Sequence, residues 1–195
     1  MSQKLWEASK KTKKNSELHA FEVFVSKKLN KNFQNSYQKL LNWSIKNYQD
    51  FWNIFWDFTE IKGLKGKKKI KKSKIFFKNI FLPNSKLNYG ENLLSKNNND
   101  KAATFISENG FREKRSWNKL NQNVSKIIEH LKDLNIKKKD RIAAYMPNTI
   151  ETVEAFIASA SLGAIWSSCS PDFGSKGVIE RFSQINPKVL FITNE

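Results

Sequence analysis

The residues best suited to chemistry follow an apolar run that begins at Gly163. They combine hydroxyl, carboxylate, proline and glycine groups and comprise Ser170, Pro171, Asp172, Phe173 and Gly174. Such a turn after a strand exposes backbone and side-chain polar groups, and ligands bind at the carboxyl edge of open α/β sheets. The pattern predicts either a ligand-binding turn or a purely structural turn.

The remaining reactive residues do not form a recognisable catalytic set. The sequence has no Gly-x-x-x-x-Gly-Lys-Ser/Thr phosphate loop, no Gly-x-Gly-x-x-Gly motif and no Gly-x-Ser-x-Gly motif. His19 and His130 are the two histidines, and Cys169 is the single cysteine. We therefore assign no catalytic residue and no metal site. Cys169 is expected to be a small buried residue, and a disulfide framework is excluded.

The net charge of +17 is concentrated in the first half of the chain, which has lysine but no arginine. Arginine is preferred for bidentate contacts with phosphate and guanine, so nucleic acid is not the favoured partner. The densest run, Lys65–Lys74, is interpreted as a solvated loop, with an anion-binding patch as the alternative. No apolar segment is long enough to span a bilayer, and no membrane partner is expected.

The first half divides into two predicted regions. Residues 1–15 are expected to form a mobile basic arm, with Trp6 as its one docking aromatic. Residues 16–98 are expected to form a helical module, because apolar residues recur at helical spacing between Leu18 and Phe58. The aromatic face of these helices is interpreted as core.

The second half, residues 99–195, has the pattern of an α/β fold. Asn109-Gly110 predicts a β-hairpin, and Ser116 is placed at the start of a long helix. Strands and helices then alternate with short connections, which predicts a parallel, doubly wound sheet. Asn148 is the predicted cap of the helix over 149–162. The last strand, residues 189–193, is expected to have little covering on one face.

Several segments, in order along the chain, resemble the acetoacetyl-CoA synthetases, a branch of the adenylate-forming acyl-CoA synthetases. The matching residues are Trp6, the segment 87–94 with Gly90 where the family has alanine, Tyr145-Met146-Pro147-Asn148, and 163–174. The resemblance implies a helical N-terminal module followed by the first βα units of an AMP-binding domain. Residues 170–174 would then approach the acyl or CoA channel.

The resemblance also implies a function. The full enzyme would convert ATP, acetoacetate and CoA to acetoacetyl-CoA, AMP and pyrophosphate through an acyl-adenylate, with Mg²⁺, in cytoplasmic lipid and ketone-body metabolism. The family's phosphate loop and C-terminal domain have no counterpart here, so we expect an N-terminal fragment that is inactive alone and whose partner is the remainder of the ligase. The alternatives are a fragment of another short-chain acyl-CoA synthetase, or a basic module that binds nucleic acid or a protein partner.

Overall fold

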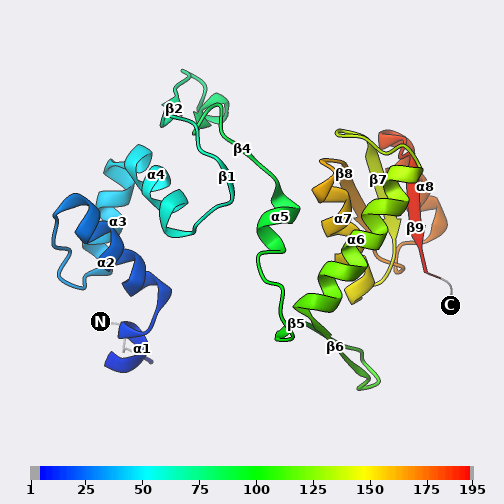
Figure 1. Ribbon diagram of the computed structural model, residues 1–195, viewed down its shortest axis with the longest axis horizontal. Coiled ribbons are helices and arrows are strands. Elements are labelled where there is room, and N and C mark those ends of the chain that lie inside the picture. Colours follow the sequence, from blue (N-terminus) through cyan, green and yellow to red (C-terminus); the bar gives the residue numbers. More distant parts are fainter. Residues whose placement is uncertain (1–4, 194–195) are drawn as a thin grey trace. The chain divides into compact units, whose positions relative to one another are not determined.

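The computed structural model describes residues 5–193, in two compact units that divide between Leu87 and Asn88 (Figure 1). This division falls earlier than the predicted boundary between residues 98 and 99. The reason is that α5 (Tyr89–Leu93) packs on α7 (Ile150–Ser161) of the second unit. The Asn88 side-chain amide, at the N-cap of α5, donates a hydrogen bond to the Ser161 carbonyl oxygen at 2.7 Å.

Four helices occupy the first part of unit 1: α1 (Lys10–Lys14), α2 (Glu17–Leu29), α3 (Tyr37–Lys46) and α4 (Tyr48–Phe58). The last three bury a shared core, which confirms the interpretation of the aromatic face as core. Its buried members are Phe21, Val25, Phe33, Leu40, Trp43 and Ile54. Phe21 makes edge-on ring contacts with residues of α4, a preferred aromatic geometry.

The predicted basic arm, residues 1–15, is only partly described, because residues 1–4 lie outside the described residues. Helix α1 forms within it, and the Ser9 hydroxyl accepts a hydrogen bond from the Thr12 amide at 3.0 Å. Trp6 is 78% exposed. The structure therefore places this tryptophan in no packed site among the described residues.

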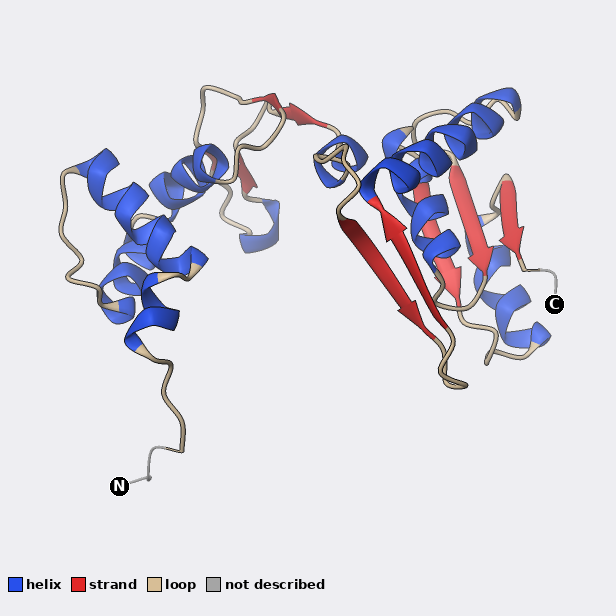
Figure 2. Cartoon of the chain, turned by 60° about the horizontal axis from the view of Figure 1, so that its bottom comes forward, coloured by secondary structure: helices blue, strands red, loops and turns tan. Residues whose placement is uncertain are grey.

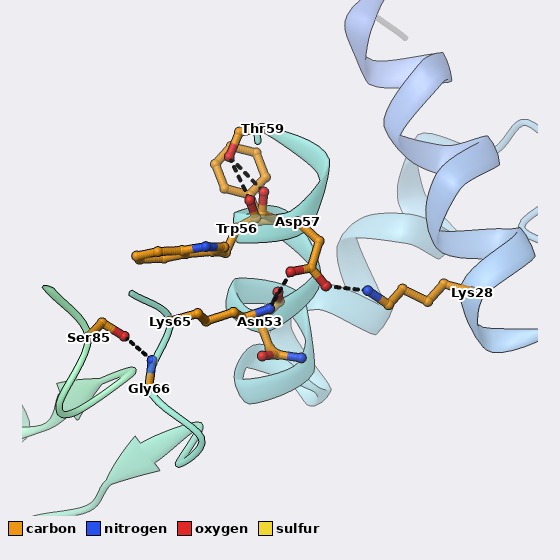
Figure 3. Close-up of polar contacts among 9 residues, drawn as sticks. Lys28, Asn53, Trp56, Asp57, Thr59, Lys65, Gly66 and Ser85 are labelled. Atoms are coloured by element: carbon orange, nitrogen blue, oxygen red, sulfur yellow. Dashed lines mark hydrogen bonds and ion pairs between the residues drawn. The ribbon is translucent and has the colours of Figure 1, made fainter. Parts of the chain in front are cut away.

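The lysine run is not simply a solvated loop, because two of its lysines form ion pairs with residues of α4. Lys65 forms an ion pair with Asp57, which also pairs with Lys28 of α2 (Figure 3). Lys69 pairs with Asp50, and Ile70 is buried. The run contains β2 (Ile70–Lys71), which pairs antiparallel with β3 (Ile80–Phe81). The solvated-loop interpretation holds only for the lysines beyond these contacts.

The remaining described elements of unit 1 are short. Strand β1 (Gly63–Leu64) pairs antiparallel with β4 (Lys86–Leu87), and a short 3-10 helix, η1, spans Phe76–Lys78. The Gly66 amide donates to the Ser85 hydroxyl at 2.8 Å, which links the two sides of this region (Figure 3).

Unit 2 begins with α5 and the predicted hairpin, formed by β5 (Lys101–Ile106) and β6 (Arg112–Ser116). Gly110 at its turn has a φ of 83°, a conformation that favours glycine. Helix α6 (Trp117–Asp133) follows, and the Ser116 hydroxyl accepts a hydrogen bond from the Lys119 amide at 3.3 Å. The hairpin and the capping role of Ser116 are confirmed.

The centre of unit 2 is a parallel sheet, drawn in red in Figure 2. The strand order is β8-β7-β9. Its strands are β7 (Arg141–Tyr145), β8 (Ile165–Cys169) and β9 (Val189–Ile192). Ile142 and Trp166 belong to the core formed with α6 and α7, whereas Ala143 and Cys169 pack against α8 (Ser175–Ile185). Helices thus cover both faces, and the predicted doubly wound α/β fold is confirmed.

Three of the described helices are followed by asparagine in a conformation where glycine is common. Asn30, Asn135 and Asn186 all have left-handed φ values, of 50°, 56° and 45°, and follow α2, α6 and α8. One capping prediction is wrong. Thr149, and not Asn148, is the N-cap of α7, and the Thr152 hydroxyl instead donates to the Pro147 carbonyl oxygen at 2.6 Å.

One face of β9 is poorly covered, as the sequence predicted. Val189 and Phe191 pack into the core with α6 and α7. Leu190 and Ile192 alternate with them and remain 50% and 60% exposed. Helix α8 therefore covers β7 and β8 more completely than β9.

Candidate functional site

The candidate site lies where β7 and β8 end. The two strands run parallel with Tyr145 opposite Cys169, so their carboxyl ends meet at the same edge of the sheet. The chain then leaves β8 through residues 170–174 and enters α8. Open α/β sheets bind ligands at this edge. The five predicted site residues therefore occupy one continuous turn at an edge suited to binding.

The turn is closed by its own hydrogen bonds. The Phe173 amide donates to the Ser170 carbonyl oxygen at 3.1 Å, as in a β-turn. The Ser170 hydroxyl donates to Asp172 Oδ2 at 2.6 Å. The Ser170 hydroxyl and the Asp172 carboxylate, the two groups in the turn that could act on a substrate, are therefore hydrogen-bonded to each other.

Tyr145 anchors the turn to the sheet, a role that sequence reasoning missed. Its hydroxyl lies 3.0 Å from the Pro171 carbonyl oxygen and 2.9 Å from that of Phe173, and it donates to this pair. Sequence reasoning gave Tyr145 no role beyond the predicted strand and the resemblance that contain it. A polar aromatic residue at the last position of a strand, beside a proline-containing turn, was the available signal.

Arg181 of α8 lies against Phe173 of the turn. The Arg181 guanidinium carbon lies 4.2 Å from the centre of the Phe173 ring, within the range of a cation–π interaction. Phe173 remains 39% exposed. The turn thus presents an accessible aromatic ring with a positive charge against it.

Gly174 leaves open space at the start of α8. A Cβ at this position would meet no atom within 4 Å, and the φ of −59° suits any residue. The same absence of neighbours holds for Gly177 in the first turn of the helix. Neither backbone strain nor packing among the described residues requires glycine at these two positions.

Cys169 does not contribute to the exposed part of the site. It is 6% exposed and packs with Ala143, Val178 and Phe182. The prediction that it is a small buried residue is confirmed.

A second polar cluster lies in unit 2, around Arg115 of β6. Its guanidinium pairs with Glu113 at 3.0 Å, with Glu151 at 2.7 Å and with Glu154 at 3.1 Å. Arg115 Nε nevertheless makes no hydrogen bond among the described residues, so its contact with Glu154 is electrostatic only. Burial raises the pKa of Glu154, although a hydrogen bond from Asn123 and the charge of Arg115 act in the opposite direction.

These carboxylates serve a structural role. The cluster joins the hairpin to α7, and the Asn123 amide of α6 donates to Glu154 at 2.9 Å. Throughout residues 5–193, no group of three or more His, Cys, Asp or Glu residues could hold a metal ion. The part of the chain that the structure describes therefore does not fit a Mg²⁺ site.

Comparison with known proteins defines the class. The family described as AMP-binding enzyme matches residues 94–195, slightly more than half of the chain. The chain belongs to the AMP-binding enzyme family. The match covers the hairpin, the sheet and the 170–174 turn.

Within that class, the resemblance to acetoacetyl-CoA synthetases is confirmed. The chain is 37% identical over 193 residues to the acetoacetyl-CoA synthetase of Macaca fascicularis, which covers 97% of this chain and 28% of the relative. The corresponding enzyme of Rhizobium meliloti is 34% identical and covers 96% of this chain and 29% of the relative. The malonamoyl-CoA synthetase of Penicillium aethiopicum is 32% identical.

A solved structure shows the same fold. Acetoacetyl-CoA synthetase from Streptomyces lividans matches with a TM-score of 0.90 and 24% identity, over 98% of this chain and 30% of that chain. The similarity lies in the N-terminal part of that enzyme. The chain thus spans less than a third of the length of these relatives, and the comparisons do not favour a nucleic-acid-binding module.

Proposed function

We propose that this chain forms the N-terminal part of a ligase that activates acetoacetate with ATP and transfers the acyl group to CoA. The similarity to acetoacetyl-CoA synthetases along nearly the whole chain carries the proposal. In that reaction a carboxylate oxygen attacks the α-phosphorus of ATP and pyrophosphate leaves. The CoA thiol then attacks the acyl carbon and AMP leaves.

The described residues do not provide the groups that this chemistry needs most. Phosphoryl transfer requires positive charge or metal around the reacting phosphate, usually with a phosphate-binding loop. The sequence contains no such loop, and the described residues contain no metal-binding cluster. We therefore assign no catalytic residue to this chain. ATP, CoA and Mg²⁺ belong to the proposed full enzyme, together with the remaining portion of the ligase.

We assign residues 170–174 to the wall of the acyl or CoA channel. Three observations support this: the turn lies at the binding edge of the sheet, Phe173 is accessible, and Gly174 has open space around it. Arg181 adds a positive charge suited to a carboxylate or a phosphate. ATP and CoA are both available in the cytoplasm, which is the compartment that we propose.

The test compares the chain alone with a chimera that joins it to the remaining length of the Rhizobium meliloti enzyme. Acetoacetate-dependent exchange of pyrophosphate into ATP is expected from the chimera and absent from the chain alone. A panel of acetoacetate, acetate, butyrate and malonamate identifies the substrate. Preference for malonamate would favour the second candidate, since one relative is a malonamoyl-CoA synthetase. Exchange by the chain alone would contradict the proposal.

The channel assignment has its own test in the active chimera. Gly174→Trp should raise the KM for acetoacetate or CoA, because an indole would fill the open space beside the turn. Ser183→Trp places the same side chain on an exposed position of the same helix and is the matched control. Unchanged KM values in a folded Gly174→Trp chimera would make the turn purely structural.

A further inference from the structure

The segment Lys67–Lys78, here called the basic aromatic tip, has an unusual combination of charge and exposure. Ten lysines and no acidic residue lie between Glu60 and Glu91. Within the tip, Phe76 is 90% exposed, Phe77 is 81% exposed and Ile75 is 43% exposed. Three consecutive apolar side chains therefore stand in solvent amid lysines. This arrangement is unfavourable for a free surface and calls for a partner.

The base of the tip is fixed to unit 1. Phe81 of β3 packs edge-on against Tyr48 at 6.0 Å between ring centres, and lies 6.0 Å from Trp52. Lys69 is paired with Asp50 on the same helix, α4. Phe81 and Lys69 therefore contact α4. Phe76 and Phe77, by contrast, are exposed to solvent.

The end of the tip is ordered by its own hydrogen bonds. The Ser73 amide donates to the Asn79 side-chain oxygen at 2.9 Å, and the Asn79 side-chain amide donates to the Phe76 carbonyl oxygen at 2.8 Å. The Ile75 amide donates to the Ser73 hydroxyl at 3.2 Å. The two phenylalanines are therefore held in an exposed turn before any partner binds, which lowers the entropic cost of binding.

The lysines without ion pairs indicate that the partner is negatively charged. Lys67, Lys68, Lys71 and Lys72 are exposed, and no ion pair involves them among the described residues. Their charge favours an anionic surface. Lysines near a negatively charged membrane each contribute on the order of 1 kcal/mol of attraction, and this attraction does not need the directed geometry of arginine.

We propose that the basic aromatic tip binds the surface of an anionic lipid bilayer. Phe76, Phe77 and Ile75 would enter the boundary between headgroups and acyl chains, and the lysines would contact the headgroups. Lipid fits better than nucleic acid because the positive charges of the tip are all lysines, whereas arginine is the residue preferred for bidentate contacts with phosphate and guanine. The cytoplasmic leaflet is anionic and suits the proposed compartment.

This surface contact departs from the prediction that no membrane is a partner, but it does not involve a spanning segment. Within the part of the chain that the structure describes, no helix is long and apolar enough to cross a membrane. The proposal is also independent of the ligase function, since it uses none of the residues at the edge of the sheet.

The test is sedimentation of the 195-residue chain with vesicles of phosphatidylcholine, with and without phosphatidylserine. Binding is expected only with phosphatidylserine and should weaken at high salt, because salt screens the lysines. Phe76→Ser combined with Phe77→Ser should lower the partition coefficient at least about tenfold. The matched control is Phe111→Ser, at a hairpin position that is 57% exposed, and it should change binding less than about twofold.

The charge is tested separately. Converting Lys67, Lys68, Lys71 and Lys72 to Gln should abolish the preference for phosphatidylserine. The control variant carries the same number of exchanges at exposed lysines of unit 2, namely Lys119, Lys126, Lys132 and Lys137. Circular dichroism of each variant confirms that the chain is folded.

A second measurement follows the tip directly. Phe76→Cys, labelled with a polarity-sensitive dye, should increase in fluorescence with anionic vesicles, whereas labelled Phe111→Cys should not. Equal binding to neutral vesicles, or loss of binding in the control variants, would overturn the proposal. So would tighter binding of single-stranded RNA through the same residues at the same salt, which would assign the tip to nucleic acid.

Discussion

Gly90 and Ser161 approach each other so closely that a Cβ at position 90 would lie 2.0 Å from the Ser161 hydroxyl oxygen. This contact explains why glycine suits a position where the family pattern has alanine. Gly90→Ala would gain about 1 kcal/mol of helix propensity. The added methyl group would displace the Ser161 hydroxyl from its hydrogen bond to the Ile157 carbonyl oxygen, at 2.8 Å.

We therefore expect Gly90→Ala to lower the free energy of unfolding of unit 2 by about 1 kcal/mol, despite the propensity gain. In a Ser161→Ala background the same exchange should cost less, because the hydroxyl is absent. A double-mutant cycle in urea measures the coupling. Additive effects of the two exchanges would contradict the close contact.

Tyr145→Phe should loosen the candidate site while leaving the sheet intact. It removes the hydroxyl that contacts the carbonyl oxygens of Pro171 and Phe173. The expected loss is about 1 kcal/mol, with faster amide hydrogen exchange confined to residues 170–174. Tyr37→Phe, in an exposed side chain of α3, is the control. Unchanged exchange in the turn would show that Tyr145 does not hold it.

Asp57→Asn should weaken unit 1 in a pH-dependent way. Burial opposes ionisation of Asp57, but hydrogen bonds from Lys28 and Lys65 outweigh it and hold its pKa below the ordinary value of 3.8. The stabilisation is therefore present above about pH 4 and is lost as pH falls through the lowered pKa. At neutral pH the variant should lose about 1 kcal/mol. Thermal unfolding across this range, with Glu60→Gln as the exposed control, checks the expectation.

Glu154→Gln should have the opposite pH dependence. Because burial raises the pKa of Glu154 above its ordinary value of 4.5, ionised Glu154 destabilises the folded chain at neutral pH. The variant should therefore be more stable than the wild-type chain at neutral pH. The gain should disappear as pH falls through the raised pKa towards 4.5. A difference in unfolding free energy between Glu154→Gln and the wild-type chain that stays constant with pH would contradict a raised pKa of Glu154.

Arg115→Met provides the contrast within the same cluster. It would leave Glu154, whose side chain is 4% exposed, without its positive neighbour. Removing one member of a buried pair typically costs about 3 kcal/mol. We expect a loss of that order in urea unfolding, and Lys114→Met, on the exposed neighbouring position of β6, should change little.

The exposed face of β9 should make the chain self-associate. Leu190 and Ile192 present apolar surface beside an edge of β9 that no other described strand pairs with. Leu190→Thr combined with Ile192→Thr should reduce association in sedimentation velocity while keeping strand propensity. The matched control is Val23→Thr, a 53% exposed position of α2. A monomeric wild-type chain at all concentrations would contradict this expectation.

Local signals made much of unit 2 predictable. Asn109-Gly110 predicted the hairpin of β5 and β6, and Ser116 was correctly placed at the start of α6. The helix cap at Thr149 could not be distinguished from Asn148, because adjacent polar residues offer the same hydrogen-bonding groups and the apolar period does not fix the start to one residue.

Contacts between distant residues were the part that sequence reasoning missed. The ion pair of Lys65 with Asp57 and the hydrogen bonds of Tyr145 to the turn depend on how elements pack. The composition of a lysine run is the same whether its side chains are solvated or form ion pairs with a helix, so composition does not predict these contacts. The position of α5 was missed for the same reason, since only its packing against Ser161 assigns it to unit 2.

The pairing of β9 with β7 also bears on the order of events during synthesis. Ile142 pairs with Val189, so the central strand lacks one neighbour until α7, β8 and α8 have all been made. The helices of unit 1 contact one another over short sequence separations, which favours rapid folding. We expect unit 1 to fold first on the ribosome. Until β9 is made, one edge of β7 has no paired strand, and we expect β7 to be the segment most accessible to chaperones.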